Sequence, residues 1–328
     1  MILTRRAALA SAAAFLAAPA LSAGTWTRTA DRARGLDQLR ALVIAQGGAE
    51  VFAEAFRGPP VTRPVNVKSV SKTVVAALLG AAIDRGEVPG VGATLGGTAP
   101  RLIPAGADPR VRDLTLEDLV TMQAGLERTS GPGYGAFVSS PNWVAHALSR
   151  PMVGEPGRGM LYSTGSFHVL GAALAEASGE SLLAQARARI GAPLGIEIPA
   201  WTRDPQGFYL GGNEMALSPR AMVAFGEMYR RGGAGVLSPT WVEASFRDRT
   251  RSPFSGMGYG YGWFLARLGG RRAMLARGYG GQVICLVPEL ELTVAITSDP
   301  DRPARGEGHF GALTALLGET LIPEAEAG

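Results

Sequence analysis

Lysine is almost absent from this chain of 328 residues. Lys68 and Lys72 are the only lysines among its 32 basic residues, and all the others are arginine. A buried lysine can lose its proton near neutral pH, whereas an arginine guanidinium stays charged in proteins. The two positions fit no Walker-type phosphate loop. They mark instead the one stretch where a titratable amine is available.

Histidine and cysteine are scarce as well. The three histidines, His146, His168 and His309, are scattered and no Gly-x-Ser-x-Gly sequence occurs, so a Ser-His-Asp hydrolase and a metal site are both disfavoured. His168 follows Tyr162 closely, but a structural role is favoured for it. The single cysteine, Cys285, cannot form an internal disulfide and is expected to be a buried strand residue. We expect no metal and no cofactor.

The chain also lacks a concentration of one charge. Its formal net charge is +4 and its arginines are scattered, so nothing predicts a nucleic-acid partner. Hydrophobic residues make up 46% and charged residues 18%, which is typical of a globular protein and excludes a disordered chain.

Residues 1–23 have the pattern of a targeting segment. Thr4, Arg5 and Arg6 precede a run rich in alanine and leucine, and small residues follow around Ala18 to Ala23, as at a signal-peptidase site. The apolar run is short for a membrane-spanning helix, which needs about 20 residues, so no stable membrane span is expected after cleavage. Paired arginines favour the twin-arginine route, with a general secretory signal as the alternative. We expect the mature protein, residues 24–328, to be periplasmic or secreted.

Strand signals lie at the two ends of the mature chain, and helix signals lie between them. Residues 39–45 and 51–56 predict a hairpin, and short β-type runs occupy 262–267, 272–276, 282–287 and 290–297. Between about 89 and 250, capping signals such as Thr115 with Asp118, Ser218-Pro219 and Ser238-Pro239 indicate helices. A last helix is expected at about 308–317. The expected fold is α+β: a mainly antiparallel sheet flanked by helices, with an inserted helical subdomain over about 89–250.

One short stretch combines a serine, a lysine and the start of a helix. Residues 67–73 read Val-Lys-Ser-Val-Ser-Lys-Thr, and the apolar run that follows predicts a helix from about Ser69 to Arg85. At helical spacing Ser69 and Lys72 share one face, so the amine can approach the hydroxyl. A lysine with a lowered pKa can activate such a serine as a nucleophile. Ser-x-x-Lys also recurs by chance, so further motifs are needed.

Two later segments complete a chemical set. Tyr162-Ser163-Thr164 lies before a helix expected at 169–177, and a tyrosine phenol beside a lysine can relay protons to a leaving group. Residues 277–282 read Arg-Gly-Tyr-Gly-Gly-Gln and enter a strand. Their glycines allow a substrate close to the backbone, where an N–H group can point at a developing oxyanion. Alone, the tyrosine would more often be packing and the glycines a turn.

In this order the motifs resemble those of the penicillin-recognising serine hydrolases, in the branch related to class C β-lactamases, family VIII esterases and 6-aminohexanoate-dimer hydrolase. The resemblance implies a β-lactamase/transpeptidase-like fold. It runs over about 41–299 and rests on Ser69-Val-Ser-Lys72-Thr73, the Leu-Thr-Leu-Glu-Asp-Leu-Val-Thr-Met-Gln-Ala-Gly-Leu of 114–126, Asn142-Trp143, Glu155-Pro-Gly157, Tyr162-Ser-Thr164, the Pro-Leu-Gly-Ile of 193–196 and the Ala-Arg-Gly-Tyr-Gly-Gly-Gln of 276–282.

The resemblance implies roles for individual residues. Ser69 would be the nucleophile, Lys72 its activating partner and Tyr162 the general base and acid. The oxyanion hole would consist of the backbone N–H groups of Ser69 and of about Gln282. The implied substrate-binding positions also include Thr164, Tyr279, Gly280 and Gly281.

Two departures from the class C pattern redirect the expected activity. Thr164 stands where those enzymes usually have asparagine, so an amide that would orient substrate and lysine is missing. The segment Tyr279-Gly280-Gly281 stands where they have Lys or His followed by Thr-Gly, and it offers no cation for a β-lactam carboxylate. We therefore expect an acyl-enzyme hydrolase of a small-molecule ester, amide or peptide, similar to an esterase or to 6-aminohexanoate-dimer hydrolase.

Other functions compete with this expectation. Within enzymes the alternatives are a D-amino-acid peptidase and a weak β-lactamase. Outside enzymes, a catalytically silent relative could bind peptidoglycan or a peptide in the same cleft. The presence of Ser69, Lys72 and Tyr162 together disfavours the silent binder.

Overall fold

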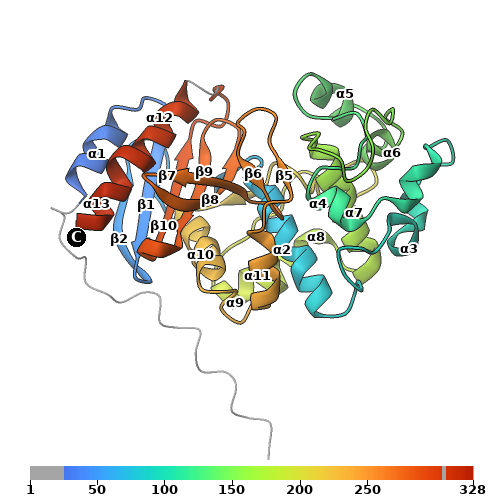
Figure 1. Cartoon of the computed structure of the whole chain (residues 1–328), viewed down its shortest axis with the longest axis horizontal. Helices are drawn as coiled ribbons and strands as arrows, with labels where there is room; N and C mark the ends of the chain where they lie inside the picture. Colours follow the sequence, from blue (N-terminus) through green and yellow to red (C-terminus); the bar gives the residue numbers. More distant parts are fainter. Residues whose placement is uncertain (1–25, 305–307, 328) are drawn as a thin grey trace, which may run out of the picture.

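The computed structural model describes residues 26–304 and 308–327, and its elements form a sheet region and a helical region side by side (Figure 1). The expected signal peptide at 1–23 lies outside the described residues. In the part of the chain that is described, no helix combines the length and apolar character needed to cross a membrane.

A single antiparallel sheet unites the two ends of the chain. β1 pairs with β10 from Leu39↔Ser298 to Gln46↔Leu292, and β1 also forms the expected hairpin with β2. The predicted antiparallel sheet is thereby confirmed. Within the described residues the sheet has eight strands in the order β2-β1-β10-β9-β8-β7-β6-β5: β1 (Leu39–Gln46), β2 (Ala49–Ala55), β5 (Thr250–Arg251), β6 (Gly258–Tyr259), β7 (Phe264–Leu268), β8 (Arg271–Gly278), β9 (Gln282–Val287) and β10 (Leu292–Ser298). The strands β3 (Val65–Asn66) and β4 (Ala216–Leu217) form a separate pair.

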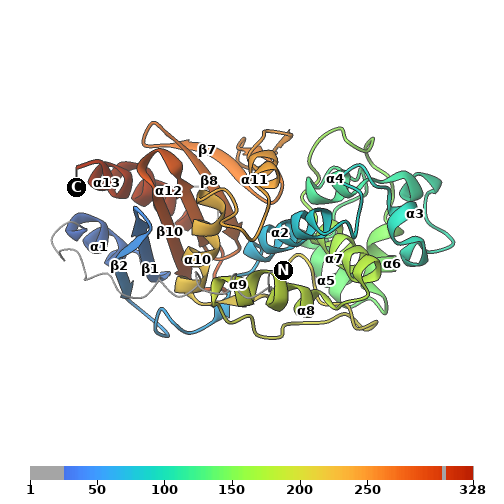
Figure 2. The ribbon, with the colours of Figure 1, turned by 90° about the horizontal axis from the view of Figure 1, so that it is seen from below.

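Helices cover both faces of the sheet, which explains why every residue of β9 and β10 is buried. On one face lie α1 (Thr27–Arg34), α12 (His309–Ala315) and α13 (Ile322–Ala327), and on the other lies α10 (Pro219–Arg230) (Figures 1 and 2). A side chain at Gly226 of α10 would come within 3.0 Å of Ile284 on β9 and Thr293 on β10. The predicted burial of Cys285 within a strand is confirmed.

The helix α2 (Val70–Asp84) runs between the two regions (Figure 2). Its residues from Val70 to Ala82 are buried on all sides, as expected for a helix that is apolar around its whole circumference. The predicted helix is confirmed, and it begins between the sheet region and the helical region.

The remaining elements lie mostly between β3 and β5. The helix expected at 169–177 begins five residues earlier, at Thr164, because a neighbouring loop takes the place of a local cap: Ser130 Oγ accepts from Thr164 N at 2.8 Å and Thr129 Oγ1 accepts from Gly165 N at 2.8 Å. The helices are α3 (Leu95–Thr98), α4 (Leu116–Val120), α5 (Tyr134–Val138), α6 (Trp143–Leu148), α7 (Thr164–Ser178), α8 (Leu182–Ala186), α9 (Ala192–Leu194) and α11 (Pro239–Ser245), with short 3₁₀ segments at Pro100–Leu102, Pro109–Asp113, Gly131–Gly133 and Pro288–Leu290 and π-helical turns at Arg187–Gly191 and Leu316–Leu321.

The predicted helix caps are confirmed. Thr115 and Asp118 form a reciprocal capping box, and Ser218 and Ser238 each accept a hydrogen bond from a backbone N–H three residues later. The boundaries of an inserted helical subdomain at about 89 and 250 stay a prediction, and α10, inside that range, packs on the sheet.

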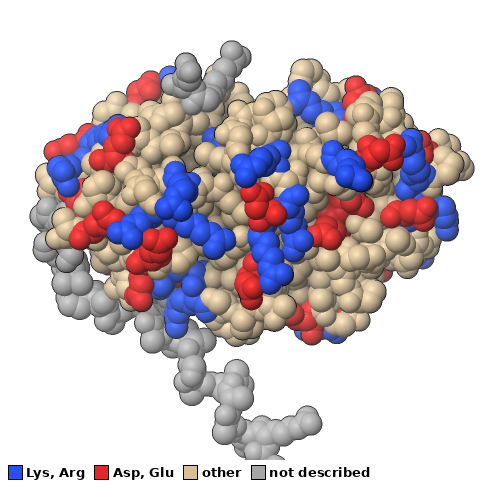
Figure 3. Space-filling model, viewed as in Figure 1, with Lys and Arg blue, Asp and Glu red and all other residues tan. Residues whose placement is uncertain are grey.

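Charges of both signs alternate over the face of the molecule in Figure 3. Many surface arginines are paired, for example Arg34 with Glu54 at 2.9 Å and Arg220 with Glu50 at 2.6 Å. This face therefore carries no extended basic patch of the kind that binds nucleic acid.

Candidate active site

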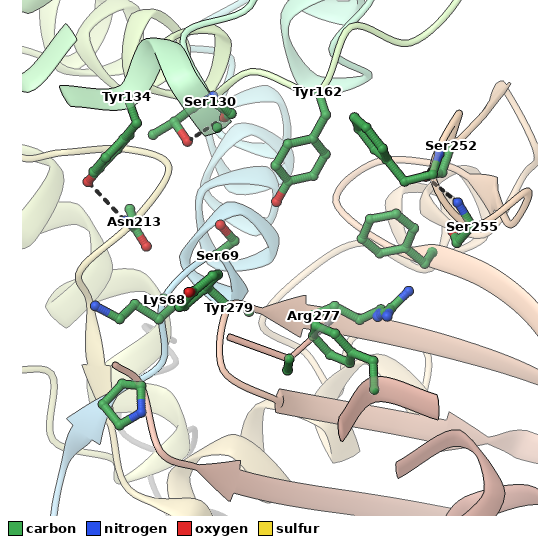
Figure 4. A pocket seen from close by; sticks show the side chains of 18 of the residues that line it. Lys68, Ser69, Ser130, Tyr134, Tyr162, Asn213, Ser252, Ser255, Arg277 and Tyr279 are labelled. Carbon is green, nitrogen blue, oxygen red and sulfur yellow. Dashed lines mark hydrogen bonds between the residues drawn. The ribbon is translucent and has the colours of Figure 1, made fainter. Parts of the chain in front are cut away.

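A cavity of about 680 Å³ opens at the start of α2, between the sheet region and the helical region. Figure 4 shows the hydroxyls of Ser69 and Tyr162 facing each other in its middle, with Lys68 on one side and Arg277 on the other. Its lining includes Ser130, Tyr134 and Thr164 from the helical region and Ser252, Phe264 and Phe310 from the sheet region.

Ser69 is the residue at the N-terminal cap of α2, but its side chain makes no capping hydrogen bond. The residue before it, Lys68, has a φ of 50°, in the left-handed region that non-glycine residues rarely adopt. Two contacts hold this turn: Lys68 N donates to Asn66 Oδ1 at 2.8 Å, and Ser71 Oγ donates to Lys68 O at 2.5 Å. The strained turn places the Ser69 hydroxyl at the cavity.

Lys72 lies beneath Ser69 and is only 2% exposed. Its Nζ is 3.0 Å from Ser69 Oγ, 2.6 Å from the carbonyl oxygen of Gly212 and 3.4 Å from Thr164 Oγ1. No described Asp or Glu forms an ion pair with it. Burial lowers the pKa of Lys72 from 10.5 to about 7. A substantial fraction of this amine is therefore unprotonated at neutral pH and can accept the serine proton.

Gly212 holds the lysine through a backbone atom, so sequence motifs gave no indication of it. A side chain at this position would lie 2.8 Å from the carbonyl oxygen of Thr164. Glycine therefore lets the 210–214 loop lie against the start of α7 and bring its carbonyl oxygen to Lys72. The local signal in the sequence is only the pair Gly211-Gly212.

Tyr162 packs against both other members of the expected catalytic set. The centre of its ring is 4.9 Å from Lys72 Nζ. Burial raises the pKa of Tyr162 above its ordinary value, while a hydrogen bond with Ser69 and the charge of Arg277 oppose that shift. The phenol is therefore protonated at neutral pH and placed to give a proton to a group leaving from Ser69.

Two backbone N–H groups at the cavity have no hydrogen-bond partner in the described part of the chain. The end of β8 touches the start of α2 so closely that a side chain at Gly278 would collide with the carbonyl oxygen of Val67 and lie 3.1 Å from Ser69 N. Among the described residues, the N–H groups of Ser69 and Tyr279 have no hydrogen-bond acceptor. Two free donors beside a nucleophile can stabilise a developing oxyanion.

Three of the predicted substrate-binding residues lie behind the cavity wall. Gln282 is fully buried, donates its amide to Ser298 O at 2.9 Å and accepts from Ser298 N at 3.1 Å, so it ties β9 to β10. Gly280 packs against the backbone of Asp299, and Gly281 packs against Ser298. The expected oxyanion donor near Gln282 is therefore corrected to the turn that directly follows Gly278, because β8 already ends there and the glycines turn away from the cavity.

Tyr279 and Thr164 do line the cavity, as expected. Thr164 Oγ1 lies 3.0 Å from Ser130 Oγ, and this hydroxyl pair connects Lys72 to the helical wall. Ser130 was missed by the sequence motifs, since it comes from a loop more than 30 residues before Thr164.

The cavity wall carries two cations, Lys68 and Arg277, among the described residues. Lys68 Nζ is 3.2 Å from Glu214 Oε1, and the two side chains form an ion pair. Residues 279–281 contain no cation, as the sequence shows, but Arg277, two residues before them in the same segment, faces the cavity (Figure 4).

The favoured structural role of His168 fits its position. It is fully buried, its Nε2 is 3.0 Å from Asp204 Oδ2, and it does not line the cavity. Within 26–304 and 308–327, no three His, Cys, Asp or Glu side chains gather where they could hold a metal ion.

Comparisons with known proteins agree with this geometry. The sequence profile of the family described as Beta-lactamase matches residues 35–316. A search of curated protein sequences gave no match.

Several solved structures are similar over most of this chain. A protein from Bacillus anthracis named as a 6-aminohexanoate-dimer hydrolase has a TM-score of 0.74 at 16% identity, covering 89% of this chain and 80% of that one. The octameric penicillin-binding protein homologue from Pyrococcus abyssi has a TM-score of 0.72 at 18% identity, covering 91% and 77%. EstCE1, a hydrolase with promiscuous acyltransferase activity, has a TM-score of 0.72 at 20% identity, covering 93% and 97%. At these identities the likeness shows the fold.

Proposed function

Because this chain belongs to the β-lactamase family of serine hydrolases, we propose that it hydrolyses a small ester or amide through an acyl-enzyme on Ser69. The observation that carries the proposal is the contact of 3.0 Å between Ser69 Oγ and the buried amine of Lys72, whose pKa is lowered to about 7. A serine beside an amine that is unprotonated at neutral pH is an activated nucleophile.

In the proposed reaction, Ser69 Oγ attacks the substrate carbonyl carbon while Lys72 accepts the hydroxyl proton. The N–H groups of Ser69 and Tyr279 stabilise the oxyanion. Tyr162 gives its proton to the leaving alcohol or amine as the old C–O or C–N bond breaks, and it regains a proton from Lys72. A water molecule then attacks the acyl-enzyme by the same relay in reverse and releases the acid.

The finer assignment is an esterase or amidase of the 6-aminohexanoate-dimer hydrolase type. It is supported by threonine at position 164 and by the hydrolases among the similar structures. A D-amino-acid peptidase, a weak β-lactamase and a silent peptide binder remain the alternatives to be tested. Residues 1–23 support the further proposal that the protein acts in the periplasm or outside the cell.

Intact-mass analysis of the purified mature protein after treatment with a fluorophosphonate tests the nucleophile. We expect one covalent adduct on the wild type and none on a folded Ser69→Ala variant. The same spectrum gives the mass of the exported chain, which we expect to begin near residue 24. An adduct that persists in Ser69→Ala would place the reactive nucleophile elsewhere, and a folded wild type without an adduct would favour the silent binder.

A further inference from the structure

His168 and Asp204 form an enclosed polar pair in the helical region, outside the cavity lining. His168 Nε2 is 3.0 Å from Asp204 Oδ2, and neither side chain is exposed to solvent. The rings of Phe137 and Trp143 lie 5.9 and 5.7 Å from the imidazole, centre to centre. Such a pair is costly to desolvate, and apolar residues of similar volume often fill its place without loss of stability. Packing alone therefore does not account for it.

Asp204 closes a loop around its own carboxylate. Its Oδ1 accepts from Gln206 N at 2.9 Å and from Phe208 N at 2.8 Å. Its backbone N–H donates to Phe208 O at 2.8 Å. The other carboxylate oxygen is left for His168, and since a carboxylate accepts hydrogen bonds, His168 Nε2 is the donor. The carboxylate thus connects the start of the 204–212 loop to α7.

The far end of the 204–212 loop holds Lys72. Gly212 O lies 2.6 Å from Lys72 Nζ. Gly211 is packed directly on α7, because a side chain there would collide with the carbonyl oxygen of Phe167 and lie 3.1 Å from His168 Cα. His168 is therefore the residue at which both ends of the loop meet α7. Its side chain bonds to one end, and its backbone lies against the other.

The helix α7 reaches the same amine from another side. Thr164, one helical turn before His168, has its Oγ1 3.4 Å from Lys72 Nζ. A side chain at Gly212 would lie 2.8 Å from the carbonyl oxygen of Thr164, so the loop and the helix touch beside the amine. The bond between His168 and Asp204 closes this ring of contacts at the end away from the cavity.

The amine can act as a base only where water is kept away. Burial lowers the pKa of Lys72 to about 7, and Gly212 O occupies a hydrogen-bonding position that water could otherwise take. The two glycines of the loop add no side chains to its packing on α7. The bond of Asp204 to His168 supplies a directional contact that they lack. A loop that left α7 would hydrate the amine and favour its charged form.

We propose that His168 is a positioning residue: its bond to Asp204 holds the 204–212 loop on α7 and thereby keeps Gly212 O, and an environment without water, at Lys72. This inference rests on the proposed function, in which Lys72 is the base for Ser69. It goes further by giving control of that base to a pair outside the cavity. Neither His168 nor Asp204 touches the substrate or the reacting atoms.

The rate at which a fluorophosphonate labels Ser69 tests this role without a choice of substrate. In the wild type the rate constant should rise with pH and level off with an apparent pKa near 7, as Lys72 deprotonates. His168→Phe keeps an aromatic ring and removes the donor to Asp204. Its labelling at pH 7 should be about 10- to 100-fold slower, the cost of a small misplacement of reacting groups. Its rising limb should move to higher pH, because water reaches the amine.

Three further variants separate positioning from general support of the fold. His168→Gln can still donate an amide N–H to Asp204 and should keep most of the labelling rate. Asp204→Ser can still accept from the backbone N–H groups of its loop but is too short to reach His168, so it should behave like His168→Phe. His146→Phe is the matched control, since its ring contacts Phe137 at 6.0 Å in the same aromatic cluster. It should match the wild type in rate and in the position of the rising limb.

Circular dichroism and urea unfolding check that each variant folds. A role in stability alone would lower the urea midpoint of His168→Phe and Asp204→Ser but leave their labelling rates and rising limbs at wild-type values, and that result overturns the inference. Failure of both variants to fold also overturns it, because the pair would then support the whole fold instead of the base. Either outcome leaves the acyl-enzyme proposal standing, whereas a folded wild type that forms no adduct overturns both.

Discussion

Lys68 and Lys72 stand four residues apart around one serine, yet their surroundings are opposite. Lys68 lies in a strained turn, and its ammonium reaches the carboxylate of Glu214 at 3.2 Å. Lys72 lies in the first turn of α2, and its neighbours are a hydroxyl pair and a backbone carbonyl. Burial lowers the pKa of Lys72 to about 7.

The difference shows what turns a lysine into a base. Burial removes hydration from the ammonium and disfavours the charged form, whereas a carboxylate at contact distance favours that form. Lys72 is buried but has no carboxylate at contact distance, since the oxygens near its amine belong to two hydroxyls and a backbone carbonyl. The following experiments alter one influence at a time.

The largest effect is expected from replacing each lysine by arginine. Lys72→Arg should lower kcat/KM for an activated ester by several orders of magnitude, because a guanidinium cannot accept the serine proton. Lys68→Arg keeps a cation beside Glu214 and should change kcat/KM by less than about tenfold. Circular dichroism checks that both variants fold. Similar activities for the two would show that the proton acceptor is not Lys72.

A smaller effect on kcat/KM is expected from placing a carboxylate beside Lys72, as Glu214 stands beside Lys68. In the wild type, kcat/KM should rise with pH and level off with an apparent pKa near 7, as the amine deprotonates. Thr164→Asp places a carboxylate near Nζ, where Thr164 Oγ1 now lies at 3.4 Å. It should raise the pKa of Lys72, move the rising limb to higher pH, and lower the rate at pH 7 about tenfold for each unit of the move.

Thr164→Asn is the matched control for that variant, since it has nearly the same shape without the charge. Its rising limb should stay near the wild-type position. If the aspartate and asparagine variants give the same pH profile, the limb does not report the protonation of Lys72.

The smallest effect concerns stability. The amine has a pKa of about 7 in the folded protein against 10.5 as the ordinary value, so between these values the unfolded chain binds the extra proton. The free energy of unfolding should therefore rise with pH in this window, by about 1.4 kcal/mol per unit from this group. Lys72→Met lacks the group, and its advantage over the wild type in urea unfolding should shrink between pH 7.5 and 9.5. A constant difference would mean that Lys72 is not buried as an amine.

The sequence was most informative where chemistry depends on local spacing. Ser69 and Lys72 lie one helical turn apart, so their contact follows from helix geometry alone. The strand hairpin and the helix caps were predictable for the same reason. Tyr162 needed the resemblance to a family, because nothing local connects a loop tyrosine to a serine 93 positions earlier.

The parts of the site that the sequence did not predict come from distant loops and from backbone atoms. Gly212 acts through its carbonyl oxygen and Tyr279 is placed to act through its N–H, and neither role depends on the kind of side chain. Ser130 reaches Lys72 only through Thr164. Arg277 lies inside the motif at 277–282, but the sequence did not predict that its side chain lines the cavity. The sequence alone does not tell which residues at the end of a strand face a cavity.

The helix that carries the proposed nucleophile also limits which substitutions the site can accept. Residues from Val70 to Ala82 are in contact with neighbours on every side, and a side chain at Gly80 would collide with the indole of Trp241. Substitutions there would cost stability before they changed specificity. New substrate ranges, in nature or in a mutant library, should therefore arise from the segments at 130–134, 252–255 and 277–279, which contribute residues to the cavity lining and leave the serine in place.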